Sequence, residues 1–468
     1  MTSLFGVLNN TNNSLRLIQG QLGMVADNVA QADNPDRTKH SLEQTVDANG
    51  NAAFAQYKRQ VDVALRVQLE QTLSEQSSAT TLSTYMRKAT DLLGTTAGTP
   101  PLTEALQKFQ SAWQQLDANP EDAVLQSQIV LYGDDLSREL QRLTRGVDDI
   151  EKQLDTDITT SVNSLNDSLA NIDKLNTEIL ATRGTGNPTL ALEDRRDQLV
   201  REVASMMSIR TVERADGKLS VFTSSGLSLV DAAPTTFSYQ DGVLRSSSSD
   251  MVLNGHIRDG QLGGLLELAA DGSQTNPPQA ASTQPGAEIL RKLKSQIEAV
   301  GQVFLSPTKS GEPTSFADAY NNAQPVADGE LPNRFFVGTS AGNIAVNPAL
   351  LSGEMKVKTS AVAQVSLSLT ATGRSVNADG LRLNSVSYSS MVTSMIGSWS
   401  TNSKIAEEQA TIATDFKSQL ELRYRNSTGV NMDEEIAMLQ VLQRNYSAAA
   451  RVMQTVNNML DAIEGIVR

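Results

Sequence analysis

Apolar residues recur at steps of three and four residues near both ends of the chain. Near the N-terminus they are Leu15, Ile18, Leu22, Val25 and Val29. Near the C-terminus the steps alternate without a break through Leu439, Leu442, Tyr446, Ala449, Met453, Val456, Leu460, Ile463 and Val467. Two apolar positions in every seven form the narrow stripe of a left-handed coiled coil. The pattern predicts a coiled-coil helix in each terminal region, 1–58 and 429–468, with a loop after the first helix.

The start of the C-terminal helix has its own sequence signals. Asn431 is a suitable N-cap, and Glu434 stands three residues later, as in a capping box. The acidic residues at 433–435 oppose the positive end of the helix dipole. Gly429 is placed to end the preceding helix. We therefore predict that a new helix begins beside Asn431.

A long apolar stripe of Leu, Ile, Val and Tyr residues occupies the first half of the chain, over residues 129–179. A continuous helix there would be about 75 Å long at 1.5 Å per residue. Gly133 and Gly146 lie within it and weaken the case for continuity. A helix with one stripe must lie along partners of similar length. We therefore expect an elongated helical bundle, built from residues 59–207 and 356–428.

The pattern changes over residues 208–355. Two strand-like segments flank the dipeptide Asp216-Gly217, and shorter β patterns follow as far as residue 245. Eight of the 14 prolines fall between Pro277 and Pro348, which predicts many loops there. The predicted fold is mostly α with a β-rich middle domain: an elongated helical bundle with N- and C-terminal coiled-coil helices and an inserted β domain.

Composition narrows the functional classes. The formal net charge is −14 and no basic cluster is present, so nucleic acid is not an expected partner. No segment reaches the roughly 20 apolar residues of a membrane helix, and no apolar run near the start precedes a cleavage site, so we expect neither membrane insertion nor a cleaved signal peptide. Cysteine is absent, which excludes thiolate chemistry. Aromatic residues make up 4%, so we expect an aliphatic core.

One segment, Gly338-Thr-Ser-Ala-Gly342, has the spacing of a nucleophile elbow. A true elbow turns from a strand into a helix and is followed later by a histidine. The residues after Gly342 have an extended pattern, and both histidines, His40 and His256, precede the motif. A turn of small residues is therefore the better interpretation, and we expect both histidines at the surface.

The acidic residues Glu193, Asp194 and Asp197 are a second candidate, because paired carboxylates can perform acid–base chemistry. Asp197 stands four residues before Arg201, which is the spacing of a salt-bridged helix face. We therefore expect a solvated face. The glycines of Gly260–Gly264 lack the lysine of a phosphate loop and are expected to form a turn. We predict no catalytic, cofactor-binding or metal site, and no cofactor.

Two terminal segments carry a family resemblance. They are Asn28-Val-Ala-Gln-Ala-Asp-Asn-Pro35 near the start and, near the end, Gly429–Glu435 with Gln443–Tyr446 and Ala449–Val452. Both resemble the terminal motifs of the flagellar axial proteins, the family of rod, hook and hook-associated proteins. The family has Gly-Tyr after the N-terminal motif, whereas this chain has Asp36-Arg37, so the turn after the first helix is expected to differ.

Three inner segments narrow the resemblance. They are Leu192–Val200, Gly260–Glu267 and Ile344–Pro348. Each is similar to the members of the family at the hook–filament junction, and we take Leu192–Val200 as the segment that distinguishes them from the others.

The resemblance implies a fold and a role. The fold is a terminal coiled coil, a helical bundle and a β-rich domain, and the role is that of a structural adaptor between hook and filament, not an enzyme. The implied partners are further copies of the chain in a ring or helical array, the hook protein, the third hook-associated protein, an export chaperone and the flagellar secretion apparatus. The implied location is the extracellular flagellum, after export without a cleaved signal peptide.

Several alternatives stay open. The chain could be another axial component, namely a hook, rod or third hook-associated protein, or more distantly an enzyme or another secreted coiled-coil protein. The terminal stripes could form an ordinary core within one chain. A stripe this narrow favours contact with other chains, because its own domain does not bury it on all sides. The predicted assembly interface therefore comprises the stripe residues Leu15 to Val29 and Leu439 to Val467, with Asn431 and Glu434 as the helix cap.

Overall fold

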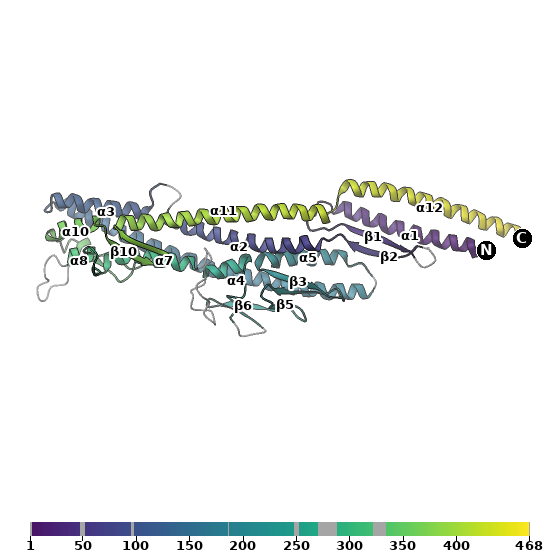
Figure 1. The fold of residues 1–468 in the computed structure, drawn as a ribbon, viewed down its shortest axis with the longest axis horizontal. Coiled ribbons are helices and arrows are strands. Elements are labelled where there is room, and N and C mark those ends of the chain that lie inside the picture. The colour runs from purple at the N-terminus through teal and green to yellow at the C-terminus, as the bar shows by residue number, and fades with distance from the viewer. Residues whose placement is uncertain are drawn as a thin grey trace. The chain divides into compact units, whose positions relative to one another are not determined.

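The computed structural model describes residues 2–46, 52–94, 98–185, 187–247, 252–269, 288–321 and 334–467. Within these ranges, only the backbone is described at 2–5, 44–46, 52–55 and 463–467. The chain forms two compact units. Unit 1 comprises Met1–Gln76, Asn163–Thr236 and Ala413–Arg468, and unit 2 comprises Ser77–Val162 and Phe237–Ile412. Three helices contribute residues to both units: α2 (Val63–Leu93), α4 (Ala123–Gly184) and α11 (Tyr388–Thr428) (Figure 1).

In its described residues, unit 1 combines parts of these helices with three further helices and two sheets. Its further helices are α1 (Thr2–Ala30), α5 (Leu190–Met206) and α12 (Met432–Val467). One sheet is the antiparallel pair β1 (His40–Val46) and β2 (Ala52–Arg59). The other has the order β3 (Ile209–Glu213), β4 (Leu219–Thr223) and β5 (Ser228–Val230). The segment expected as a loop after the first helix thus contains a hairpin. Its second strand includes Tyr57 and Lys58, which alternate across its two faces and gave no clear apolar pattern.

In its described residues, unit 2 contains further helices and three antiparallel strand pairs, besides its share of the long helices. The helices are α3 (Pro101–Ala118), α6 (Gly260–Ala269), α7 (Ile289–Leu305), α8 (Phe316–Asn321), α9 (Pro348–Leu351), η1 (Thr359–Ala361) and α10 (Val362–Thr370). The strands pair as β6 (Phe237–Gln240) with β7 (Val243–Ser246), β8 (Phe336–Val337) with β9 (Ala345–Val346), and β10 (Arg374–Ala378) with β11 (Leu381–Val386). The mostly helical fold with small antiparallel sheets in the middle confirms the predicted fold class.

Helix α4 is continuous, and close packing accounts for the two glycines inside it. A Cβ on Gly133 would lie 2.6 Å from the Phe335 ring, and a Cβ on Gly146 would lie 2.3 Å from Leu92 Cδ1. Glycine therefore lets neighbouring side chains approach the helix backbone, rather than ending the helix. The predicted stripe lies on its buried face, with Leu140, Ile158 and others fully covered.

The three-stranded sheet of unit 1 contains the two strands predicted on either side of the Asp216-Gly217 turn, with Ile209 opposite Thr223 and Glu213 opposite Leu219. Val221, Leu229 and their neighbours are buried. The Asn176 side chain of α4 bonds to both backbone groups of Leu219, at 2.8 and 2.9 Å. These bonds fasten β4 to the long helix.

Unit 2 has an aromatic core. Eight rings pack with centroid separations of 4.8–6.5 Å, namely Phe109, Trp113, Phe304, Phe316, Tyr320, Phe335, Phe336 and Tyr388. The described core is mainly aliphatic, as expected, and this aromatic cluster of unit 2 is the exception. The overall aromatic content is low, and these few rings are concentrated in one place rather than spread over the chain.

Candidate functional site

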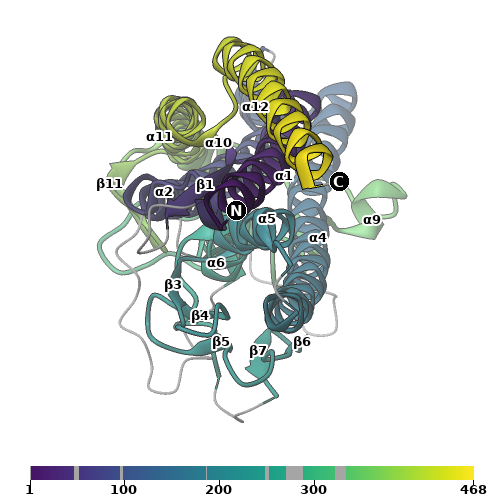
Figure 2. The same cartoon turned by 90° about the vertical axis from the view of Figure 1, so that its right-hand side faces the viewer.

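The two terminal helices lie side by side in unit 1, where α1 packs along α12 (Figures 1 and 2). Residues from both predicted stripes face this contact. Val25, Leu442 and Val456 are buried. The remaining stripe residues with described side chains are half-buried: Leu15, Ile18, Leu22, Val29, Leu439, Tyr446, Ala449, Met453 and Leu460. The side chains of Ile463 and Val467 lie outside the described part of the chain.

A second apolar face of α12 remains open. Each of its members precedes a stripe residue by one position, so this face lies about 100° around the helix from the contact with α1. Met438 and Met459 are each 50% exposed, Val441 is 48% exposed and Val452 is 45% exposed. The helix therefore has more apolar surface than α1 covers.

The first turn of α12 is capped on one side. Asn431 Oδ1 accepts hydrogen bonds from the backbone N–H groups of Asp433, at 3.0 Å, and Glu434, at 3.5 Å. The Glu434 carboxylate does not complete a capping box, because it binds Lys39 Nζ at 3.0 Å. The acidic first turn thus serves both the helix dipole and a cation from another segment.

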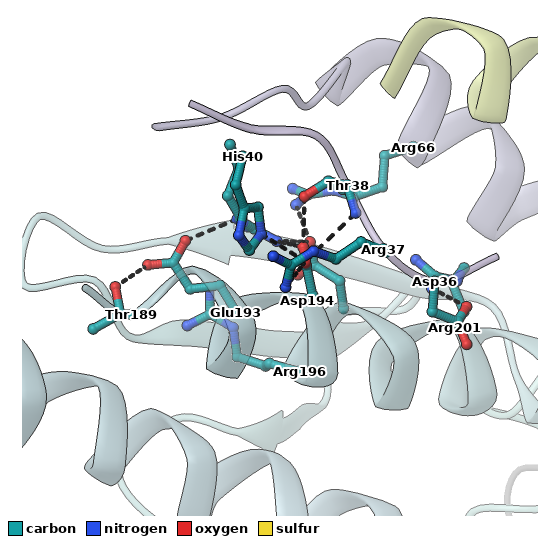
Figure 3. A network of polar contacts seen from close by, with 12 residues as sticks. Asp36, Arg37, Thr38, His40, Arg66, Thr189, Glu193, Asp194, Arg196 and Arg201 are labelled. Carbon is teal, nitrogen blue, oxygen red and sulfur yellow. Dashed lines mark hydrogen bonds and ion pairs between the residues drawn. The ribbon is translucent and has the colours of Figure 1, made fainter. Parts of the chain in front are cut away.

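A buried polar network adjoins this turn, and Asp194 of α5 is its central residue (Figure 3). Asp194 Oδ1 accepts a hydrogen bond from the Thr38 hydroxyl at 2.6 Å. Asp194 Oδ2 lies 2.8 Å from His40 Nε2. Arg59 Nη1 donates to Asp194 Oδ1 at 2.9 Å. One carboxylate therefore holds the start of β1 and the end of β2.

The expectation of a solvated acidic face on α5 is wrong. Glu193, Asp194 and Asp197 are at most 7% exposed. Arg59 bridges all three, with Nε 2.9 Å from Glu193 Oε2 and Nη1 3.0 Å from Asp197 Oδ2. Buried carboxylates require such charge-matched partners. Arg201 pairs elsewhere, so the spacing of Asp197 and Arg201 had suggested the wrong ion pair.

The same network reaches both terminal helices through Asn28 of α1, which is fully buried. Asn28 Nδ2 donates to the backbone oxygen of His40 at 2.8 Å and to Glu435 Oε2 at 3.1 Å. Asn28 Oδ1 accepts from the His40 N–H at 3.2 Å. Lys39 Nζ lies 3.1 Å from Glu435 Oε1. Three segments noted in the sequence, around Asn28, Asp194 and Glu435, therefore meet around residues 37–40.

Asp36 and Arg37, which replace the Gly-Tyr of the resembled motif, each form an ion pair. Asp36 Oδ1 accepts from Arg201 Nη2 at 2.5 Å. Arg37 pairs with Asp27 and lies 3.9 Å from Asp194. Neither residue has a positive φ, so this turn needs no glycine.

The carboxylates of the network differ in their electrostatics. Burial raises the pKa of Asp194, but the hydrogen bond with His40 and the charge of Arg59 outweigh it, so this pKa lies below its usual range. The pKa of Glu193 is also lowered, because contacts with Thr189 and Arg59 outweigh burial. Burial dominates at Glu70 on α2 and raises its pKa to about 7.

The remaining chemical candidates have structural positions. Gly338–Gly342 forms the turn between β8 and β9, in which the Ser340 hydroxyl bonds to Asn343 Oδ1 at 3.1 Å. Gly260–Gly264 begins helix α6 instead of forming the predicted turn. The Arg258 backbone lies so close to Gly263 that this position needs a residue without Cβ. His256 is exposed, as expected, whereas His40 is buried in the network.

Two absences concern only the described residues. Within them, no group of three or more His, Cys, Asp and Glu side chains is arranged to hold a metal ion. Likewise, the helices in the described ranges include none with the length and apolarity needed to cross a membrane.

Comparison with known proteins gives consistent matches. Residues 86–304 match the family described as flagellar hook-associated protein FlgK helical domain, and residues 424–466 match the flagellar basal body rod FlgEFG protein C-terminal family. Flagellar hook-associated protein 1 of Escherichia coli (strain K12) is 23% identical over 554 residues, covering 98% of this chain and 99% of that protein. The protein of the same name from Bacillus subtilis (strain 168) is 23% identical over 521 residues, covering 99% and 98%.

A solved structure, the flagellar hook junction protein FlgK from Burkholderia pseudomallei, aligns with a TM-score of 0.43 and 18% identity, over 55% of this chain and 43% of that one. The sequence matches identify the chain as a flagellar axial protein. Within this class, it is similar over nearly its whole length to flagellar hook-associated protein 1 of Escherichia coli and Bacillus subtilis.

Proposed function

We propose that this chain is a structural subunit of the bacterial flagellum that joins the hook to the filament. It assembles through its terminal helices into a ring or helical array, with the hook protein on one side and the third hook-associated protein on the other. It has no enzymatic role. It reaches the extracellular flagellum through the flagellar secretion apparatus with an export chaperone.

The observation that carries this proposal is the open apolar face of α12. Met438, Val441, Val452 and Met459 remain about half exposed although α1 already packs on the neighbouring face. Large apolar side chains that stay exposed on one face of a helix are typical of an interaction surface. The half-buried seam between α1 and α12 supports the same conclusion, because two helices alone leave coiled-coil positions partly open. We propose that further copies of the chain cover both.

The test compares two aspartates placed at exposed positions of α12. Val452→Asp puts a charge on the open apolar face, and Gln454→Asp puts the same charge on a polar position of the same helix. Each variant replaces the natural protein in cells, and filaments are counted by electron microscopy. We expect Val452→Asp cells to carry hooks without filaments and to shed flagellin, because a buried unpaired charge is costly. Gln454→Asp cells should swim.

Normal filaments on Val452→Asp cells would contradict assembly through this face. Filaments on cells that lack the chain entirely would contradict the junction role itself. The two results are distinguishable, because the second does not involve α12.

A further inference from the structure

Helix α2 carries a buried carboxyl group, Glu70, that lacks the hydrogen bonds of its acidic neighbours. Glu70 is 5% exposed. Its one ion pair within the described residues is with Arg66 of the same helix, where Arg66 Nε lies 3.7 Å from Glu70 Oε1. This separation is longer than a hydrogen bond, so charge alone holds the carboxylate. By contrast, buried Asp194 accepts hydrogen bonds from Thr38 and Arg59.

Arg66 does not fully neutralise Glu70, because it is shared with a second carboxylate. Arg66 Nη1 lies 3.6 Å from Asp197 Oδ2 on α5. Arg66 Nε is buried and has no hydrogen-bond acceptor in the described part of the chain. Asp197 has a closer cation in Arg59, at 3.0 Å. Among the acids of this cluster, Glu70 therefore has the weakest set of partners.

The surroundings of Glu70 favour its neutral form. The charged and titratable side chains of the cluster are Arg66 on α2, Asp197 and Arg201 on α5, Arg59 on β2 and Tyr424 on α11. Burial has the largest effect on Glu70, and the charge of Asp197 acts in the same direction. Together they outweigh Arg66 and Arg201 and raise the pKa of Glu70 to about 7.

We propose that Glu70 is a proton-binding group that controls how tightly α2 packs against α5. While the proton is bound, the carboxyl group is neutral and Arg66 interacts with Asp197 alone. When the proton leaves, two buried carboxylates compete for Arg66, and the contact between the two helices loosens. This proposal concerns the body of unit 1 and goes beyond the junction role.

The direction of the effect follows from the two pKa values of Glu70. The ordinary pKa of a glutamate is about 4.3, whereas that of Glu70 in the folded chain is about 7. Between these values the folded chain holds a proton that the unfolded chain has lost, so protonation favours folding. This stabilisation is fully present below about pH 4 and is lost as the pH rises through about 7. The stabilising charge of Asp194 has the opposite dependence, because it is lost in acid.

The first test measures the protonation of Glu70 directly. The purified full-length chain is labelled with glutamate that carries ¹³C in the side-chain carboxyl group. Its NMR spectrum is recorded from about pH 4 to about pH 9, a range that includes both pKa values. The resonance of Glu70 is the one that is missing from Glu70→Gln. We expect its midpoint near pH 7, well above the midpoints of exposed glutamates.

The second test measures the packing of α2 by hydrogen exchange. Leu69 and Leu73 lie beside Glu70 on this helix and pack in a hydrophobic cluster with α11. The protection of their amides, corrected for the intrinsic pH dependence of exchange, is compared at about pH 5.5 and about pH 8, on either side of the folded pKa. We expect the natural chain to lose protection by about tenfold or more at the higher pH, because each pKa unit corresponds to a factor of about ten.

Two variants assign this effect to one carboxyl group. Glu70→Gln keeps the shape of the side chain but cannot ionise, so it should lose most of the pH dependence. Glu75→Gln is the matched control, because Glu75 is an exposed acid on the same helix. This control should keep the pH dependence of the natural chain.

Three results would overturn the proposal. The Glu70 resonance could titrate below about pH 5, as in an exposed glutamate. The protection of α2 could be the same at both pH values in the natural chain. Finally, Glu70→Gln could keep the full pH dependence, which would assign it to another group. None of these results bears on the junction role, which the α12 variants test separately.

Discussion

Phe109 of α3 tests whether the aromatic cluster is the stabilising centre of unit 2. Its side chain is 0% exposed. Its ring lies 5.6 Å from Phe316, Phe335 and Phe336, 6.1 Å from Trp113 and 6.5 Å from Phe304. The substitution Phe109→Ala therefore leaves a cavity whose walls come from α3, α7, α8 and the β8 region.

The magnitude follows from burial and from ring contacts. Replacing a buried Phe by Ala costs about 3–5 kcal/mol in other cores. Part of this cost comes from aromatic pairs, at about 0.5–1.5 kcal/mol each, and these contributions are not additive. Because the rings come from α3, α7, α8 and the β8 region, no single element can move to fill the space. We expect a loss of about 4 kcal/mol in the free energy of unfolding of unit 2.

The assay uses tryptophan fluorescence during urea unfolding. The chain has two tryptophans, Trp113 and Trp399, and both are buried in unit 2. The signal therefore reports on this unit alone. Leu367→Ala is the matched control, because Leu367 lies in unit 2 and is 63% exposed. A loss below about 1 kcal/mol for Phe109→Ala, with an unchanged slope against urea, would refute the assignment of this centre.

Three further predictions follow from other parts of the structure. The pKa of Asp194 is lowered on folding, so the stability that this carboxylate contributes is present at neutral pH. This contribution is lost as the pH falls through the pKa of Asp194 in the folded state, below about 4, which a pH series of thermal unfolding would detect. A flat profile below about pH 4 would contradict this expectation. Asn431→Ala should weaken α12 by about 1 kcal/mol by freeing the N–H of Asp433, seen as faster exchange in the first turn, and unchanged exchange there would count against the cap. Gly301→Ala should destabilise unit 2 by about 1–3 kcal/mol, because its Cβ would lie 2.6 Å from the Ala341 Cβ. The control Gly397→Ala meets open space and should stabilise its helix. Equal effects of the two substitutions in urea unfolding would refute the packing argument.

The sequence predicted those parts of the fold in which one periodic pattern decides the outcome. The stripe of α4 and the pair of strands around Asp216-Gly217 are local patterns, and the structure confirms both. The glycines of α4 gave a misleading signal, because their partners Phe335 and Leu92 are distant in sequence. A contact that joins distant segments leaves no periodic trace in either of them.

The network around Asp194 was missed for the same reason. Asp197 and Arg201 have the spacing of a surface ion pair, but Arg59, more than a hundred residues earlier, is the actual partner of Asp197. One signal was available, because Glu193, Asp194 and Asp197 lie within one turn of a helix between buried Leu190 and Leu199. Three acids on the apolar side of a helix require buried cations.

The division of the chain between the two units has a consequence for the order of folding. Unit 2 needs only residues 77–412, whereas unit 1 needs the first, the middle and the last segments of the chain together. When a chain appears from its N-terminus, long-range contacts form only after both partners are available. The bond between Asn28 and Glu435 spans 407 residues, so it is among the last that can form. Until Ala413–Arg468 arrives, Asn28 and Lys39 lack their partner Glu435, and the N-terminal helix stays unpaired.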